Sequence, residues 1–192
     1  MDNSKAVHSP RLFIGIKTDV SPNLLKTITH HKQLLKDSKI KWSPIENLHI
    51  TLRFLGTTPA YYIKSLSQAL DNLAILSQPF TLAFTHTGYF GEQKPRVLWL
   101  GIEKSQQLNT LFESLADALD QLGFANENRL YMPHLTLGRI KQIADMNTLN
   151  NLTKSQELGI PPFTVKQISL FESISTDNGP VYKILHSAIL EG

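Results

Sequence analysis

The sequence predicts an α+β fold made of two similar halves, with antiparallel or mixed sheets. Strand-like segments often follow one another directly or are separated by single helices, a pattern that suits α+β better than a regular βαβ alternation. The order strand, helix, His-x-Thr strand also occurs twice, and the spacing from Arg11 to Arg96 equals that from His49 to His134. Such a duplication would relate two lobes by a local pseudo-twofold axis and turn both histidines toward one groove.

The first half begins with an apolar strand over residues 11–17, followed by a helix over residues 22–37. Ser21 is a good N-cap, the proline after it suits the first turn, and leucine and isoleucine recur at mostly helical spacing. Two adjacent histidines, His30 and His31, fall on this helix. We expect both to lie on its solvated face.

Residues 48–55 form the first His-x-Thr strand. Side chains alternate between the two faces of a strand, so His49 and Thr51 should share one face. By the same alternation Arg53 should join them, where it would either add positive charge to the groove or lie at a solvated strand end. The opposite, apolar face should consist of Ile50, Leu52 and Phe54.

Four further elements connect the two His-x-Thr strands. Residues 59–77 have leucine and isoleucine at helical spacing, and residues 80–86 alternate as a strand. A loop rich in turn residues should cover 88–95, and residues 96–103 read as the next strand. We expect the helix to be structural.

The second half repeats the pattern with a helix over residues 105–122, which starts at a serine cap and ends before Gly123. A polar loop over residues 125–129 follows. The second His-x-Thr strand then begins at His134 and places Thr136 on the same face as that histidine.

The C-terminal part contains a weakly helical segment over residues 144–156 and a pair of prolines that breaks the chain. Strands are expected over residues 163–174 and 181–190, joined by a hairpin loop over residues 176–179. No linker long enough for a second independent domain is visible. We therefore expect residues 1–192 to form one bilobal domain, with 1–10 as a flexible tail.

The composition excludes several classes of protein. A chain of 192 residues that is 41% hydrophobic can bury a sizeable core. The chain has no cysteine, which removes disulfides, cysteine-zinc sites and thiol nucleophiles and is compatible with a reducing cytosol. It also lacks an apolar run long enough to span a membrane and the apolar core of a signal peptide. We expect a cytoplasmic protein.

The charge favours an anionic partner. The net charge is +3 and the pI is about 9.1. This bias is mild and spread along the chain, so it is not by itself a signature of DNA binding.

Paired histidines suggest acid-base chemistry at phosphorus. One neutral imidazole can accept a proton while a protonated one donates. Thr51 and Thr136 could donate hydrogen bonds to non-bridging phosphate oxygens as charge shifts in the transition state. A zinc site would need a third or fourth ligand, and no HExxH pattern supplies one. A serine hydrolase would need a GxSxG nucleophile elbow, which is also absent. The scheme requires no metal.

Three stretches resemble one enzyme family. Residues 46–56 (ENLHITLRFLG), 95–101 (PRVLWLG) and 133–139 (PHLTLGR) are similar to those of bacterial and archaeal RNA 2′,3′-cyclic phosphodiesterases, also called 2′-5′ RNA ligases. These enzymes belong to the 2H phosphoesterase superfamily. The resemblance runs from Arg11 to about Lys183, nearly the whole chain.

The resemblance implies a bilobal fold with helices packed outside the sheets and both motifs in a central groove. It implies hydrolysis of a terminal RNA 2′,3′-cyclic phosphate to a 2′-phosphate, without a cofactor. His49 would protonate the departing 3′ oxygen, His134 would activate water, and Thr51 and Thr136 would bind the phosphate. The residues alone are nearly symmetric and do not decide which histidine is the acid.

Two further substrate-binding residues follow from the resemblance. Arg139 matches a family arginine that contacts phosphate, although strand alternation aims it away from His134. A bulge near Gly138 would resolve this conflict. Tyr131 stands where the family often has phenylalanine, which still permits stacking on a terminal base. Met132 replaces a polar or basic residue of many members, so base preference is not transferred.

Other functions use the same groove. The reverse reaction would join RNA ends through a 2′-5′ linkage, and the residues cannot separate it from hydrolysis. A binding module without turnover is the other alternative, and intact histidines and threonines in both motifs argue against it. We expect a monomer whose partners are RNA ends or nucleotides with a 2′,3′-cyclic phosphate.

Overall fold

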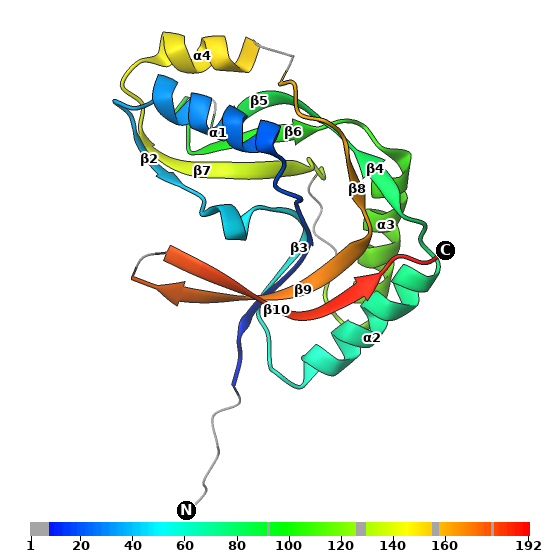
Figure 1. Cartoon of the computed structure of the whole chain (residues 1–192). Helices are drawn as coiled ribbons and strands as arrows, with labels where there is room; N and C mark the ends of the chain where they lie inside the picture. The colour runs from blue at the N-terminus through cyan, green and yellow to red at the C-terminus, as the bar shows by residue number, and fades with distance from the viewer. Residues whose placement is uncertain (1–7, 92, 126–129, 155–157, 178) are drawn as a thin grey trace, which may run out of the picture.

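The computed structural model has the predicted α+β fold, in which helices cover the outside of a curved antiparallel sheet (Figure 1). Most of the expected 1–10 tail and of the 125–129 loop lies outside the described residues. At the start of the described chain, the backbone carbonyls of His8 and Pro10 accept hydrogen bonds from the amides of Ala60 and Thr58. The structure describes residues 8–91, 93–125, 130–154, 158–177 and 179–192.

The described strands form one large sheet and one small one, and every strand pair is antiparallel. The two halves of the large sheet correspond to the two expected lobes. In spatial order the large sheet contains β10 (Gly179–Ile189), β9 (Gln167–Thr176), β1 (Arg11–Lys17), β3 (His49–Thr57), β7 (His134–Gln142), β6 (Val97–Ile102) and β5 (Phe84–Phe90), and β2 (Lys39–Trp42) also pairs with β7. The small sheet contains β4 (Phe80–Leu82) and β8 (Phe163–Val165).

The helices pack their leucine-rich faces against the two halves of the sheet. In Figure 1, α1 and α4 lie over the half that contains β5, β6 and β7, whereas α2 lies along β9 and β10 beside α3. Ser21 and Ser105 cap α1 and α3 as predicted, each accepting a hydrogen bond from the amide three residues later. The helices are α1 (Pro22–Leu34), α2 (Tyr62–Ile75), α3 (Gln106–Gln121), α4 (Met146–Lys154) and a short 3-10 turn, η1 (Ile45–Asn47).

The predicted duplication is visible in the order of the elements. With β2, η1 and β10 set aside, the series β1, α1, β3, α2, β4, β5 is followed by β6, α3, β7, α4, β8, β9. Equivalent elements of the two series meet, since β3 pairs with β7 and β4 with β8. Each His-x-Thr strand also pairs with the strand that opens its own series. The two motifs therefore lie at the centre of the sheet.

Some boundaries differ from the prediction because pairing between distant segments decides them. The strand expected over 80–86 is two strands, β4 and β5, which belong to different sheets. β5 continues into the expected loop as far as Phe90, which pairs with Val97. Similarly, the strand expected over 163–174 divides into β8 and β9. Among the described helices none is long and apolar enough to cross a membrane.

Candidate active site

His49 and His134 line one cleft at the junction of the two halves of the sheet. They are brought there by the pairing of Ile50 with Leu135, which joins β3 to β7. Thr51, Thr136 and Arg139 line the same cleft, which has a volume of about 160 Å³. Five of the six predicted site residues thus share one cavity.

Both histidines are held by the same type of hydrogen bond. The Nδ1 atom of His49 lies 2.6 Å from the carbonyl oxygen of Asn47, and that of His134 lies 2.8 Å from the carbonyl oxygen of Met132. A carbonyl oxygen only accepts, so each Nδ1 must carry the proton. In the neutral imidazole, Nε2 is then the nitrogen that can accept a proton from a substrate or water.

Aromatic rings lie against each imidazole and shield it partly from water. The ring of His49 lies 4.8 Å from that of Phe13 and 5.0 Å, edge-on, from that of Tyr182. The ring of His134 lies 4.9 Å from that of Phe90. Burial lowers the pKa of both histidines below the usual value, and their mutual repulsion lowers that of His49 further.

A β-bulge occurs at the same place in both His-x-Thr strands. In β3, Leu52 has no paired residue in β1, and in β7, Leu137 has no paired residue in β6. The extra residue reverses the alternation beyond it. Consequently Phe54 and Arg139, each five residues after its histidine, turn into the cleft. The bulge expected near Gly138 is present.

The bulge in β3 overturns the predicted placement of two neighbours. Phe54 was expected on the apolar inner face, but its side chain is 64% exposed and lines the cleft. Arg53 was expected beside His49 and is instead 7% exposed, where it donates a hydrogen bond to the carbonyl of Ala125. The prediction failed because strict alternation does not hold across a bulge.

The two threonine side chains are free for a ligand. Neither Thr51 nor Thr136 makes a side-chain hydrogen bond with another described residue, and both are half-buried at the cleft. Each hydroxyl follows its histidine by two residues on the same face. A phosphate between the histidines would therefore find a donor on either side.

Tyr131 occupies an adjoining hollow rather than the histidine cleft. Its ring stacks on Phe112 at 3.9 Å, and its hydroxyl lies 3.4 Å from the carbonyl oxygen of Thr51. Phe90, Met132 and His134 also line this hollow, which we call the apolar hollow. Stacking of Tyr131 on a base remains a prediction, and Phe112 already covers one face of its ring.

Sequence reasoning missed several residues that line the cleft, among them Asn47, Tyr182 and Lys41. The side chain of Asn47 donates to the carbonyl oxygen of Pro180 at 2.7 Å, which ties the β9–β10 hairpin to the segment before His49. Tyr182, on β10, closes the cleft beside His49. The position of Asn47 within the quoted motif was an available signal. Tyr182 had none, because only the tertiary fold brings the hairpin to the histidines.

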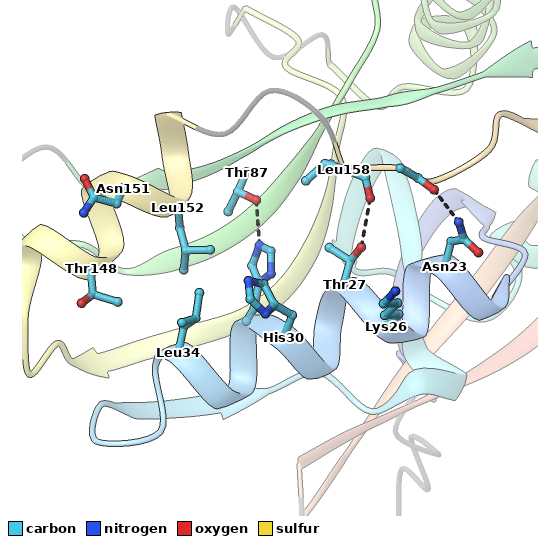
Figure 2. Close-up of a pocket in the computed structure, with 12 residues that line it drawn as sticks. Asn23, Lys26, Thr27, His30, Leu34, Thr87, Thr148, Asn151, Leu152 and Leu158 are labelled. Carbon is cyan, nitrogen blue, oxygen red and sulfur yellow. Dashed lines mark hydrogen bonds between the residues drawn. The ribbon is translucent and has the colours of Figure 1, made fainter.

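A larger cavity of about 670 Å³ lies elsewhere, between α1, β5 and α4 (Figure 2). His31 was expected in solvent, yet it is 3% exposed there, and its Nε2 lies 2.7 Å from the hydroxyl of Thr87. His30 remains exposed as expected. No predicted site residue lines this cavity.

Across the described segments, no three His, Asp or Glu side chains are grouped as a metal site.

The family follows from comparison with known sequences. A model of the 2′-5′ RNA ligase superfamily matches residues 21–177. The chain belongs to this superfamily. One relative is a Methanocaldococcus jannaschii protein that is 33% identical over 91% of this chain and 98% of its own length. Another is a Thermotoga maritima protein that is 31% identical over 95% of this chain and 96% of its own length. Both are named RNA 2′,3′-cyclic phosphodiesterase.

Solved structures of the superfamily share the fold. TT0787 of Thermus thermophilus superposes with a TM-score of 0.77 at 25% identity, covering 95% of this chain and 98% of its own. Escherichia coli LigT complexed with 3′-AMP superposes with a TM-score of 0.75 at 26% identity, covering 96% of this chain and 99% of its own. These superpositions extend over nearly the whole of each chain. The predicted 2H phosphoesterase fold is therefore confirmed.

Proposed function

We propose that this protein hydrolyses the terminal 2′,3′-cyclic phosphate of RNA to a 2′-phosphate by two-histidine acid-base catalysis. The observation that carries the proposal is the pair of imidazoles in one cleft, each with Nδ1 bound to a backbone carbonyl and Nε2 available. Relatives similar over nearly the full chain are named for this activity. The pair suits displacement at phosphorus, where one proton must be removed and another supplied.

In the proposed reaction, His134 takes a proton from water through Nε2 as the water oxygen attacks phosphorus. The bond between phosphorus and the 3′ oxygen breaks, and the Nε2 proton of His49 passes to that oxygen. Phosphorus keeps its bond to the 2′ oxygen, so the product is a 2′-phosphate with a free 3′-hydroxyl. The order of acid and base follows the family resemblance, since the two hydrogen-bonding patterns are alike.

The electrostatics of the cleft suit this substrate. Lys41 and Arg139 line it together with the two histidines, and no carboxylate is among the described residues that line it. The hydroxyls of Thr51 and Thr136 would donate to the non-bridging oxygens, which gain charge in the transition state. Arg139 would stabilise the same charge. No step in this scheme requires a metal ion.

The apolar hollow offers a place for the terminal base. It is contiguous with the cleft, since Thr51, Phe54 and His134 line both. Its lining is mostly aromatic and aliphatic, with Arg53, Thr51 and His134 as the polar members, and gives a base a stacking surface without fixing its identity. Tyr131 would act here as part of the floor that supports the base.

Joining of RNA ends is the second candidate, favoured by the name of the superfamily. A 5′-hydroxyl would then replace water as the nucleophile, and His134 and His49 would keep their roles as base and acid. The geometry does not separate the two nucleophiles, so the product must.

The test uses an oligoribonucleotide with a 2′,3′-cyclic phosphate end and a second one with a 5′-hydroxyl. We expect the cyclic end to be converted to a 2′-phosphate, identified against synthetic 2′- and 3′-phosphate standards, with activity retained in excess chelator. Ligated product resistant to a nuclease specific for 3′-5′ linkages would favour joining. Absence of turnover, or a requirement for added divalent metal, would overturn the proposal.

A further inference from the structure

The histidine cleft also continues into a hollow of different chemistry. This second hollow, which we call the basic hollow, has a volume of about 400 Å³. It shares Phe54, Arg139, Pro180 and Tyr182 with the cleft, so the two cavities are contiguous. Its lining supplies hydrogen-bond donors where the apolar hollow supplies rings. The donors are Arg11, Arg139, Ser173, Ser175, Thr176 and Tyr182.

Two arginines from opposite halves of the sheet converge in the basic hollow. Arg11 opens β1, and Arg139 reaches the hollow because of the bulge in β7. The phenol of Tyr182 lies within reach of both charges: burial raises its pKa, while Arg139 and Arg11 oppose that rise. The hollow therefore holds two cations around one neutral hydroxyl.

Neither arginine is neutralised within the described part of the chain. Its one ion pair joins His186 to Asp71, and neither residue lines the basic hollow. The nearest carboxylate along β9, that of Glu172, is one residue from Ser173 and so belongs to the opposite face of the strand. Two unpaired guanidinium groups beside hydroxyl donors are suited to a phosphate, which guanidinium binds through two parallel hydrogen bonds.

The positions of the two hollows correspond to the parts of a nucleotide chain. With the cyclic phosphate between the histidines, the terminal base needs an apolar surface and the next phosphate toward the 5′ end needs a cationic one. The apolar hollow offers the first and the basic hollow the second. A strand leaving the cleft on the basic side would pass Arg139, which lines both cavities, and then Arg11.

We infer that Arg11 binds the phosphate on the 5′ oxygen of the terminal nucleotide, with Arg139 placed between this phosphate and the cyclic one. The protein should then favour an oligonucleotide with a cyclic phosphate end over a nucleoside 2′,3′-cyclic phosphate. This inference rests on the proposed function, since it places the terminal nucleotide by its cyclic phosphate. A charge-assisted hydrogen bond at a solvent-accessible site predicts a preference of about tenfold or more in kcat/KM.

The experiment compares four substrates: adenosine 2′,3′-cyclic phosphate, its 5′-phosphorylated form, the dinucleotide ApA with a cyclic phosphate end, and that dinucleotide with a neutral methylphosphonate linkage. We expect the dinucleotide to exceed the nucleoside about tenfold, and the methylphosphonate to lose this advantage. The 5′-phosphorylated form should also have a higher kcat/KM than the nucleoside cyclic phosphate, because it carries a phosphate on the 5′ oxygen. A dinucleotide advantage that survives the methylphosphonate would overturn the inference.

Variants identify the arginine. Arg11→Gln should lower the ratio of dinucleotide to nucleoside kcat/KM about tenfold and make it less dependent on salt. Lys183→Gln is the matched control, because this exposed lysine follows Tyr182 and belongs to the other face of β10. Its ratio should equal that of the wild type. An unchanged ratio in Arg11→Gln, with the protein folded by circular dichroism, would contradict the assignment.

Binding separates this inference from the proposed function. Calorimetry with ApA ending in a 2′-phosphate, and with its methylphosphonate analogue, requires no turnover. The phosphate site is supported if the wild type binds the analogue more weakly than the phosphodiester, and if Arg11→Gln binds the two ligands equally. This holds even if no substrate is hydrolysed. Equal binding of the two ligands by the wild type refutes the site, even if hydrolysis of the cyclic phosphate is observed.

Discussion

Ile50 and Leu135 face each other across β3 and β7, and each directly follows a cleft histidine. Both side chains are fully buried. A slip of one residue would turn these apolar side chains outward and the histidines inward, so burial fixes the register. The catalytic geometry that we propose is thus secured by core packing as well as by polar contacts.

Replacing either histidine should nearly abolish turnover. We expect His49→Ala and His134→Ala each to lower kcat by roughly 10²–10⁴-fold, the usual contribution of a general acid or base. The double variant should lose much less than the product of the single losses, because the two groups act as a unit. Single-turnover kinetics on a cyclic phosphate substrate measure this. Near-normal turnover in either folded single variant would refute the mechanism.

The threonine hydroxyls should matter less than the imidazoles. Thr51→Val and Thr136→Val keep the branched shape and remove one charge-assisted hydrogen bond, worth about 1.5–3 kcal/mol. This corresponds to roughly 10–100-fold in kcat/KM. Thr→Ser at each position retains the hydroxyl and should restore most of the rate. A Ser variant as slow as the Val variant would show that shape, and not the hydroxyl, is required.

The pH profile should reflect the lowered pKa of both cleft histidines. The active pair needs one protonated and one neutral imidazole, so kcat/KM should be bell-shaped, with apparent values that belong to the pair. Burial lowers both pKa values, so the second proton is lost below the usual value of about 6.5. We expect the maximum of kcat/KM on the acid side of 6.5.

Bound substrate should move this maximum. The negative phosphate favours imidazolium, so the kcat profile should lie at higher pH than the kcat/KM profile. Initial rates between pH 4.5 and 9, with folding checked at each pH, give both curves. A kcat/KM that rises monotonically through this range would remove the requirement for a protonated imidazole.

Outside the cleft, His31 should make the fold sensitive to acid. Burial lowers its pKa from 6.5 to about 4. Between these values the unfolded chain binds more protons, so its contribution to stability is complete above 6.5 and is lost as the pH falls to about 4. The full shift corresponds to about 3 kcal/mol.

Urea unfolding at pH 7 and pH 4.5 tests this contribution. Between these conditions His31→Gln should lose about 2–3 kcal/mol less stability than the wild type, because glutamine does not titrate. The exposed neighbour provides the control, and His30→Gln should lie close to the wild type, differing only by the small repulsion that His30 exerts on His31. If His31→Gln and the wild type lost equal stability, the buried imidazole would not be the titrating group.

Much of the candidate site could be predicted from the sequence because its geometry is local. Strand alternation requires His49 and Thr51 to share a face, and the second copy repeats this for His134 and Thr136. The repeated spacing then indicates that the two copies are related by symmetry. Serine caps gave the starts of α1 and α3 for the same local reason.

The tertiary structure alone decided which side chains complete the cleft. A bulge arises from the mismatch between two paired strands. The sequence of β3 by itself therefore did not show that Phe54, and not Arg53, faces the cleft. Tyr182 reaches His49 only when β10 folds back on β9 and β9 pairs with β1. His31 is buried because β5 supplies a hydroxyl for its ring. Alternation and capping depend on neighbours in the chain, whereas bulges, long-range pairing and burial depend on segments that the sequence places far away.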